Sequence, residues 1–323
     1  MTNLLADLLS ERDYLITDGA TGTNMMLRGL PAGRPPDLWN ADGTEHVSWL
    51  HDAMIEAGAD IILTNTFGSN PCRLKLDKAA ERTTEINVAG ARLARAAADK
   101  ASRPVVVAGS VGPTGEMMEP FGTLTSEAAE AAFYEQMSAL AEGGADVIWI
   151  ETIFAFDELA AAVKAANRTG LPVVSTMTFD TASRTMMGNT AEQAVAFTHE
   201  FSPRLAAFGA NCGAGPAMLI DSVVGLCKAA DEHDVIVAKG NCGIPQMVDG
   251  EIVYSGTNEV MAEYARLARD CGARIIGGCC GTTPERLKAI VDALDGYEPQ
   301  PMPDRDKIVE RLGPIKVPPP GSV

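Results

Sequence analysis

The sequence has 323 residues, of which 46% are hydrophobic and 21% charged, a balance typical of a globular protein with a full core. A formal net charge of −17 disfavours nucleic acid and anionic membrane surfaces as partners, because phosphate groups would be repelled. Seven cysteines in a chain too long to need disulfide bridges fit a reducing compartment. No apolar run reaches the ~18 residues of a membrane span, and residues 1–10 lack a secretory pattern, so we expect a cytoplasmic protein.

Short apolar segments alternate with helical patterns along the chain. The segments rich in β-branched residues predict strands at residues 14–17, 61–65, 105–108, 147–151, 173–177, 206–210, 236–239 and 274–277. The amphipathic or alanine-rich segments predict helices at residues 45–57, 77–100, 126–143, 157–169, 190–201, 216–232 and 258–270, with a last one beginning at Glu285. The chain therefore repeats a strand and a helix eight times.

Eight such units fit either a doubly wound open sheet or a closed barrel. Residues 18–23 resemble a phosphate-binding turn, but they lack the dinucleotide fingerprint and a Walker lysine. Candidate ligands at the ends of non-neighbouring strands can meet only in a closed ring, so we predict an α/β fold of the (β/α)₈ TIM-barrel class, with its site at the carboxyl ends of the strands. Residues 1–296 form the predicted barrel domain, and residues 297–323 a proline-rich tail that wraps around it or is disordered.

Two long insertions, at residues 30–39 and 114–125, follow the first and third predicted strands. Loops of this length on the active face of a barrel usually cover or contact a ligand. We therefore expect both to border the site.

Adjacent cysteines in a glycine-rich turn are the strongest chemical signal. Cys279 and Cys280 stand in the run Gly-Gly-Cys-Cys-Gly-Thr-Thr-Pro, where a curled backbone can bring both sulfurs to one point. This pattern favours a metal site over buried thiols or a strained vicinal disulfide. Cys212 and Cys242 also follow predicted strands and are the candidates for a third ligand, whereas the four histidines fall in or beside helices.

Three thiolates on Zn²⁺ would leave one coordination position open, as in a catalytic site. The negative charge of such a centre suits it to activating a sulfur nucleophile rather than to hydrolysis. Asp18 and Glu151 end the first and fourth strands, where each could form a salt bridge with a neighbouring cation or bind a ligand's ammonium group. The glycines beside Asp18 could expose backbone N–H groups to a carboxylate. These features describe a site for an amino acid that carries a thiol.

Several motifs resemble those of the homocysteine S-methyltransferases, which include betaine-dependent and S-methylmethionine-dependent enzymes and the homocysteine module of cobalamin-dependent methionine synthase. They are Asp-Gly-Ala-Thr-Gly-Thr from Asp18, Thr-Asn-Thr-Phe ending at Phe67, Glu-Thr-Ile from Glu151, Ala-Asn-Cys ending at Cys212, and Gly-Gly-Cys-Cys-Gly-Thr-Thr-Pro. The resemblance covers residues 14–294. It implies a (β/α)₈ barrel that transfers a methyl group to homocysteine and forms methionine.

The resemblance also implies roles for individual residues. Zinc would be held by Cys212, Cys279 and Cys280, and the homocysteine amino group would lie near Glu151 and Asp18. The homocysteine carboxylate would lie near the backbone of Gly19 and Ala20. Further contacts, direct or through another residue, are expected from Thr66, Ser110 and Asn241.

The methyl donor is less closely defined by the resemblance. Animal betaine enzymes carry a Phe-Tyr pair where this chain has Phe67-Gly68, so one aromatic ring is missing. Trp39, Phe67 and Phe121, with Phe154, could surround a betaine-like onium donor by cation–π contacts, or they could only pack the covering loops. Betaine or a similar onium compound is the favoured donor.

Two other readings remain open at this point. In the first, the chain is the homocysteine-activating subunit of a split cobalamin-dependent methionine synthase and works with a corrinoid protein. In the second, it is a non-catalytic zinc or thiol protein. The sequence does not define the oligomeric state, and a homo-oligomer is possible.

Overall fold

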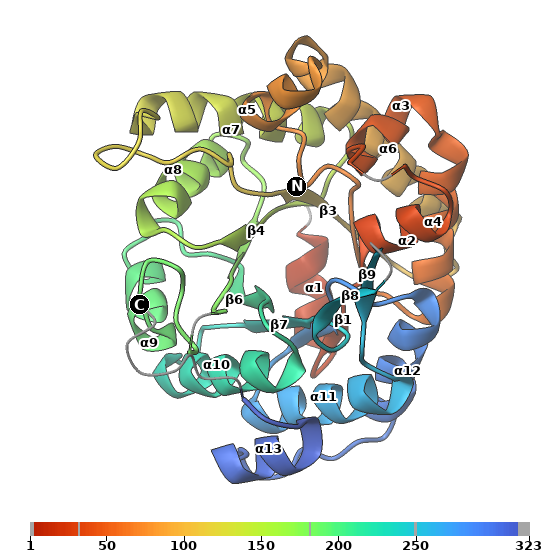
Figure 1. Cartoon of the computed structure of the whole chain (residues 1–323), viewed down its shortest axis with the longest axis vertical. Coiled ribbons are helices and arrows are strands. Elements are labelled where there is room, and N and C mark those ends of the chain that lie inside the picture. Colours follow the sequence, from red (N-terminus) through yellow and green to blue (C-terminus); the bar gives the residue numbers. More distant parts are fainter. Residues whose placement is uncertain (1–2, 32, 181, 249–250, 316–323) are drawn as a thin grey trace.

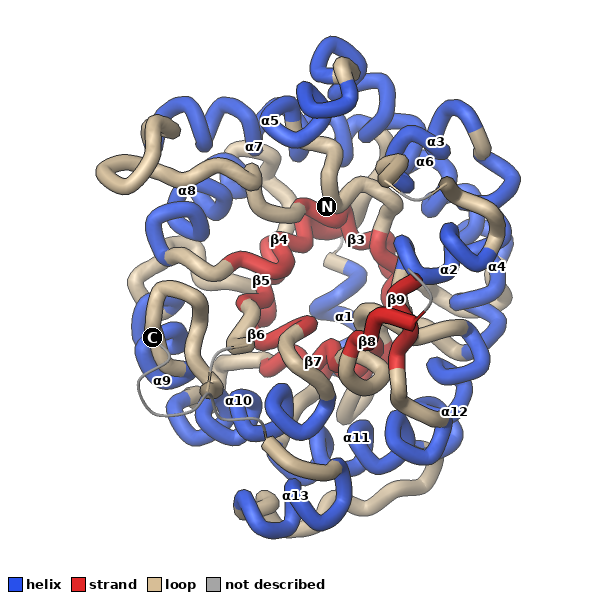
Figure 2. Tube along the Cα trace, viewed as in Figure 1, coloured by secondary structure: helices blue, strands red, loops and turns tan. Residues whose placement is uncertain are grey.

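A ring of parallel strands lies at the centre of the computed structural model, which describes residues 3–31, 33–180, 182–248 and 251–315 (Figure 2). The hydrogen-bonded order is β1-β10-β7-β6-β5-β4-β3-β2, and a parallel bridge between Thr17 and Ile61 joins the two ends. The strands of the ring are β1 (Leu15–Ile16), β2 (Ile61–Leu63), β3 (Val106–Val111), β4 (Val147–Ile153), β5 (Val173–Met177), β6 (Ala207–Cys212), β7 (Ile236–Gly240) and β10 (Ile275–Gly278). The predicted (β/α)₈ barrel is confirmed.

Helices form the outer layer around this ring (Figure 1). Those that follow the strands of the ring are α2 (Thr21–Leu27), α3 (Trp39–Asp42), α4 (Thr44–Ala57), α5 (Pro71–Leu74), α6 (Thr83–Lys100), α7 (Ser126–Glu142), α8 (Phe156–Asn167), α9 (Ala191–Thr198), α10 (Pro216–Ala229), α11 (Asn258–Cys271) and α12 (Pro284–Leu294). One prediction was wrong: α6 begins at Thr83 rather than at residue 77. The chain before it forms the short 3₁₀ turns Lys75–Asp77 and Ala80–Arg82, because Lys78 between them has a φ of 57° that an α-helix does not allow.

Apolar side chains fill two layers of core. Strands of a parallel sheet are covered on both faces, so their sequences are apolar at nearly every position. One layer fills the barrel interior and includes Leu15, Trp149 and Val237, and the other lies between the strands and the helices. Leu5 and Leu8 of α1 (Leu4–Glu11) join the interior layer, so this helix closes the end of the barrel opposite the strand carboxyl ends.

Besides the short helices α2, α3 and α5, three features were not predicted from the sequence. The first is α1. The second is a hairpin of β8 (Pro245–Val248) and β9 (Glu251–Tyr254), which follows β7; its strands are short, and a leading proline is typical of a loop or a strand edge. The third is α13 (Arg305–Leu312), which packs on α10 and α11 within the predicted tail. Residues 316–323 of that tail lie outside the described part.

No helix among the described residues is both long and apolar enough to cross a bilayer.

Candidate metal and substrate site

Three cysteines from distant parts of the sequence meet at the carboxyl ends of the strands. Cys212 ends β6, and Cys279 and Cys280 directly follow β10, with β7 lying between these two strands in the ring. The Sγ atoms of Cys212 and Cys280 are 3.9 Å apart, and all three sulfurs lie within 4.8 Å of one another. Cys242, the other candidate for third ligand, is outside this cluster; it is buried, and its N–H donates to the carbonyl of Cys280.

The backbone is constrained at both cysteine segments. Cys212 has a φ of 64°, in the left-handed region, which is uncommon for a residue with a side chain. Before the cysteine pair, a Cβ atom on Gly278 would lie 2.2 Å from the hydroxyl of Thr282, so only glycine fits there. Such constrained backbone is typical of functional sites. Here it turns the sulfurs of both segments toward one point.

The cluster has the donor set of a thiophilic metal. Hydrogen bonds from Cys212 and Cys279 lower the pKa of the Cys280 thiol, whereas hydrogen bonds with Cys279 and Cys280 raise the pKa of Cys212. Three thiols this close therefore cannot all ionise unless a cation offsets their charge. Three convergent sulfurs are the ligands that Zn²⁺ and other soft cations prefer. Cys212, Cys279 and Cys280 are thus the residues that could hold a metal.

Asn211 supports the cluster and was not singled out as a site residue from the sequence. Its side-chain oxygen accepts hydrogen bonds from the Thr152 N–H (2.9 Å) and the Thr176 hydroxyl (2.8 Å). Its amide group donates to the Thr152 hydroxyl (2.8 Å) and lies 3.8 Å from the Cys279 sulfur. The Ala-Asn-Cys motif was the available signal for this role.

Tyr254 is a second residue that the sequence did not reveal. The β8–β9 hairpin lies over the barrel mouth (Figures 1 and 2), and its last residue, Tyr254, forms a side-chain hydrogen bond with Cys280. This contact lowers the pKa of Cys280 further. The hairpin therefore contributes to the site as well as covering it.

Tyr264 of α11 joins the two strands beneath the cluster. Its hydroxyl accepts a hydrogen bond from the Gly240 N–H of β7 (2.9 Å) and donates one to the Gly277 carbonyl of β10 (3.1 Å). The side chain is fully buried. It therefore positions the segment that carries Cys279 and Cys280.

Replacing Tyr264 by phenylalanine is expected to lower the free energy of unfolding by about 1–3 kcal/mol, because the buried N–H of Gly240 would lose its acceptor. Urea denaturation followed by circular dichroism measures this change. Tyr134→Phe is the matched control, since the described residues supply its hydroxyl with no hydrogen-bond partner. Equal stability of the two variants would contradict the bridging role.

Glu151 and Asp18 lie on the same rim but have different partners. Glu151, in β4, accepts a hydrogen bond from the Ser110 hydroxyl (2.5 Å), and burial raises its pKa to about 7. Asp18 forms an ion pair with Lys239 (2.9 Å) and accepts a hydrogen bond from the Leu63 N–H (2.7 Å). Burial raises the pKa of Asp18, and the Lys239 ammonium acts in the opposite direction. Of the two roles that the sequence left open for Asp18, a salt bridge or the binding of a ligand's ammonium group, the structure shows the salt bridge.

The other predicted substrate contacts are partly engaged within the protein. The Ala20 N–H donates to the Thr282 carbonyl (3.0 Å), so a ligand carboxylate could use the Gly19 amide but not that of Ala20 unless this bond broke. Thr66 is fully buried, and its hydroxyl donates to the Ser110 carbonyl (2.7 Å), so this hydroxyl is already engaged within the protein.

Asn241 offers a buried acceptor. Its amide group donates to the Gly213 carbonyl (2.7 Å), beside Cys212. Its side-chain oxygen is buried and has no hydrogen-bond partner among the described residues. A buried polar atom without a partner is costly, so it is suited to receive a donor from a ligand.

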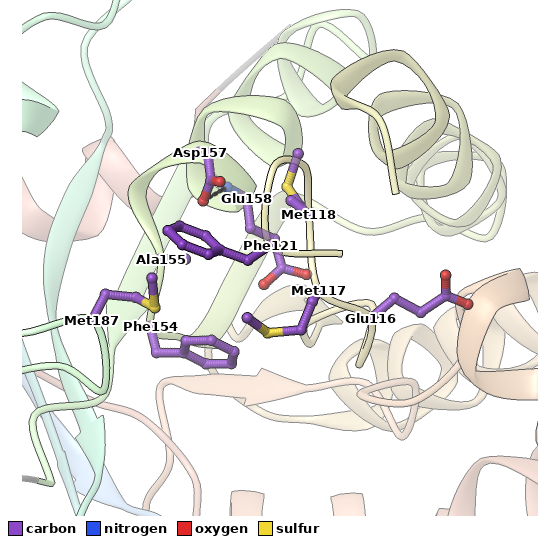
Figure 3. A pocket seen from close by; sticks show the side chains of 9 residues that line it. All are labelled: Glu116, Met117, Met118, Phe121, Phe154, Ala155, Asp157, Glu158 and Met187. Carbon is purple, nitrogen blue, oxygen red and sulfur yellow. Dashed lines mark hydrogen bonds between the residues drawn. The ribbon is translucent and has the colours of Figure 1, made fainter. Parts of the chain in front are cut away.

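The predicted donor-binding aromatic residues have different neighbours. Trp39 stacks on His46 of α4 with ring centroids 4.3 Å apart, and Phe67 packs close to Gly112. Phe121 is 75% exposed and lines a pocket together with Phe154. Figure 3 shows that this pocket is lined by Glu116, Met117, Met118, Phe121, Phe154, Ala155, Asp157, Glu158 and Met187. Neither Trp39 nor Phe67 lines it, so the structure brings only Phe121 and Phe154 together.

The fold and the site define a TIM-barrel protein with three convergent thiols and two buried carboxylates at the carboxyl ends of its strands. The family model described as homocysteine S-methyltransferase matches residues 15–294. The chain therefore belongs to the homocysteine S-methyltransferase family.

Individual relatives agree with this family. The chain is 30% identical over 308 residues to the methionine synthase of Mycobacterium tuberculosis and 28% identical over 318 residues to that of Mycobacterium leprae. These matches cover 90% and 92% of this chain but only 25% and 26% of the relatives, so it spans about a quarter of their length.

Solved structures show the same fold. The oxidised form of the homocysteine methyltransferase MmuM from Escherichia coli has a TM-score of 0.76 and 25% identity, over 90% of this chain and 99% of that one. The metallated form of MmuM has a TM-score of 0.74 and 24% identity, over 89% of this chain and 98% of that one.

Proposed function

We propose that the chain is a zinc-dependent enzyme that transfers a methyl group from a betaine-like onium donor to the thiol of homocysteine. The observation that carries the zinc assignment is the convergence of Cys212, Cys279 and Cys280 within 4.8 Å. Three cysteine ligands would leave zinc able to accept the substrate sulfur as a further ligand. The existence of a metallated form of MmuM supports the proposal of a bound metal.

When bound, zinc would lower the pKa of the homocysteine thiol below its ordinary value of ~8.5 and so provide a nucleophile at neutral pH. The chain's own residues orient the substrate. The homocysteine amino group faces the carboxylates of the rim, its carboxylate lies toward the Gly19 amide, and the Asn241 oxygen provides a further acceptor. The thiol gives up its proton to water, its sulfur attacks the methyl carbon and a C–S bond forms. The bond between the methyl carbon and the donor heteroatom breaks, and its electron pair stays on that heteroatom.

A corrinoid protein as the donor is the second candidate. The observation that favours it is the similarity to mycobacterial methionine synthases, of which this chain spans about a quarter. A partner protein would then deliver the methyl group to the barrel mouth. The third alternative, a non-catalytic zinc or thiol protein, receives no support from the family to which the chain belongs.

The donor is tested by supplying glycine betaine, dimethylsulfoniopropionate and S-methylmethionine singly, together with homocysteine and zinc, and by measuring methionine. We expect one of these compounds to support methionine formation. A methylated corrinoid protein is the comparison. Methionine from the corrinoid protein alone would contradict the onium proposal and favour the partner protein.

A further inference from the structure

Strand β4 contains a strained bulge directly after Glu151. Its pairing with β5 shifts register between Ile150 and Ile153, and Thr152 has a φ of 64°, in the left-handed region that is uncommon for a residue with a side chain. A bulge leaves one residue unpaired in the ladder, so the N–H of that residue needs an acceptor from outside the strand pair. Strained backbone of this kind persists where the surrounding structure holds it.

Asn211 supplies the acceptor that this bulge needs. Its side chain is fully buried in β6, and its oxygen accepts hydrogen bonds from the Thr152 N–H (2.9 Å) and from the Thr176 hydroxyl (2.8 Å). A backbone N–H can only donate, so the side-chain atom that faces it must be the oxygen of Asn211 and not the nitrogen. The contacts of the oxygen therefore fix the direction in which the amide nitrogen points.

The amide nitrogen of Asn211 points at a hydroxyl and at a sulfur of the thiol cluster. It donates to the Thr152 hydroxyl (2.8 Å) and lies 3.8 Å from the Cys279 sulfur, at the distance of an N–H···S hydrogen bond. An asparagine side chain has two donor hydrogens and an oxygen with two lone pairs. These contacts engage all of them, so the amide cannot turn away from the sulfur without losing hydrogen bonds at the bulge.

The hydrogen bond at Cys279 gains strength when this cysteine binds a metal. Cys279 is one of the three residues that could hold the metal, and the form of cysteine that binds a metal is the thiolate. A hydrogen bond to a charged acceptor is roughly twice as strong as one between neutral groups. Residues that hydrogen-bond to metal ligands orient these ligands, and their loss lowers metal affinity. The amide of Asn211 is placed to act in this way on the Cys279 sulfur.

We propose that Asn211 is a positioning residue for the metal: its amide donates an N–H···S hydrogen bond to the metal-bound thiolate of Cys279, and the bulge at Thr152 aims the amide. This inference rests on the proposed binding of a metal by Cys212, Cys279 and Cys280. The hydrogen bond draws negative charge from one ligand sulfur and fixes the direction of its side chain. One buried asparagine thereby joins the strained end of β4 to a metal ligand that follows β10.

The hydrogen bond itself is tested by NMR on the wild-type protein, loaded with a spin-active isotope of cadmium in place of zinc. Cadmium is a soft cation that thiolate ligands also bind. The side-chain amide protons of Asn211 are assigned from its own backbone resonances. We expect one of these protons to show scalar coupling to the cadmium nucleus, because the coupling passes through the hydrogen bond and the sulfur. An Asn211 amide without this coupling overturns the inference.

The contribution of Asn211 to metal binding is measured with Asn211→Ala, by competition between the protein and a chelator for zinc. We expect the affinity for zinc to fall by about 10- to 100-fold, the range typical for the loss of a residue that supports a metal ligand. Asn87→Ala is the matched control. Asn87 of α6 is also a fully buried asparagine, but its amide donates to the carbonyls of Ser69 and Thr83 and not to a cysteine, so its loss should leave the affinity for zinc unchanged.

The possible failures give different results. An Asn211→Ala protein that binds zinc as tightly as the wild type overturns this inference, and so does a loss of affinity without coupling in the wild-type spectrum, which would give Asn211 a structural role alone. Both results leave the metal site in place. A wild-type protein that binds neither zinc nor cadmium overturns the metal assignment in the proposed function as well.

Discussion

Replacing Cys280 by alanine is expected to remove the bound metal and to lower methionine formation by at least about 100-fold. Two sulfurs bind the metal more weakly than three. Even the loss of a residue that only supports a metal ligand typically lowers metal affinity or activity about 10- to 100-fold, so the loss of a ligand should have at least this effect. Cys280 lies 3.9 Å from Cys212 and also contacts Tyr254, so its sulfur is central to the cluster. Metal content is measured by mass spectrometry of the purified protein, and turnover by the methionine formed.

Cys242→Ala is the matched control for this experiment. Cys242 also follows a barrel strand and was the competing candidate, but its sulfur is not part of the cluster. We expect this variant to retain its metal and most of its turnover. A Cys280→Ala protein with full metal content, or a Cys242→Ala protein without metal, would contradict the assignment of ligands.

Replacing Trp149 by alanine is expected to lower the free energy of unfolding by about 3–5 kcal/mol, the range typical of large-to-small changes in a core. Trp149 is fully buried in the barrel interior, among apolar side chains from the other strands. The Lys239 ammonium group lies near its ring, so the cavity would open directly beneath the ion pair with Asp18. Urea denaturation measures the loss.

The variant Trp149→Phe separates the effect of ring volume on stability from the effect of the indole N–H. The indole N–H is buried without a hydrogen-bond partner among the described residues, so its removal costs nothing in hydrogen bonding. Phenylalanine keeps much of the apolar volume, and we expect a loss well below that of the alanine variant. An alanine variant within about 1 kcal/mol of the wild type would show that the interior is less tightly packed than described.

The architecture could be predicted from local patterns. Residues 173–177, predicted as a strand, are β5, and the other predicted strands overlap the remaining strands of the ring. The periodicity of buried strands and amphipathic helices is a local property, so it is visible in one sequence. The turn at Cys279 and Cys280 was visible for the same reason, since its glycines and cysteines are adjacent.

The partners of site residues could not be predicted in the same way. Asp18 and Glu151 were both predicted at the carboxyl ends of strands. Only Asp18 forms an ion pair with a lysine, which lies 221 residues away in sequence. The position of Tyr254 depends on a hairpin whose two strands are too short to give a clear pattern. Trp39, Phe67 and Phe121 all follow strands in the sequence, but packing gives them different neighbours.

The sequence by itself determined the alternation of strands and helices and the adjacent cysteines after the last strand. The closed barrel was inferred from the places of the candidate ligands, and the choice of Cys212 as third ligand rested on the family resemblance. Only the tertiary structure decided which of the two carboxylates forms an ion pair with Lys239. The physical reason is that strand formation depends on residues near one another in the chain. An ion pair in a barrel depends on which side chains from distant strands reach the same buried point after the ring closes.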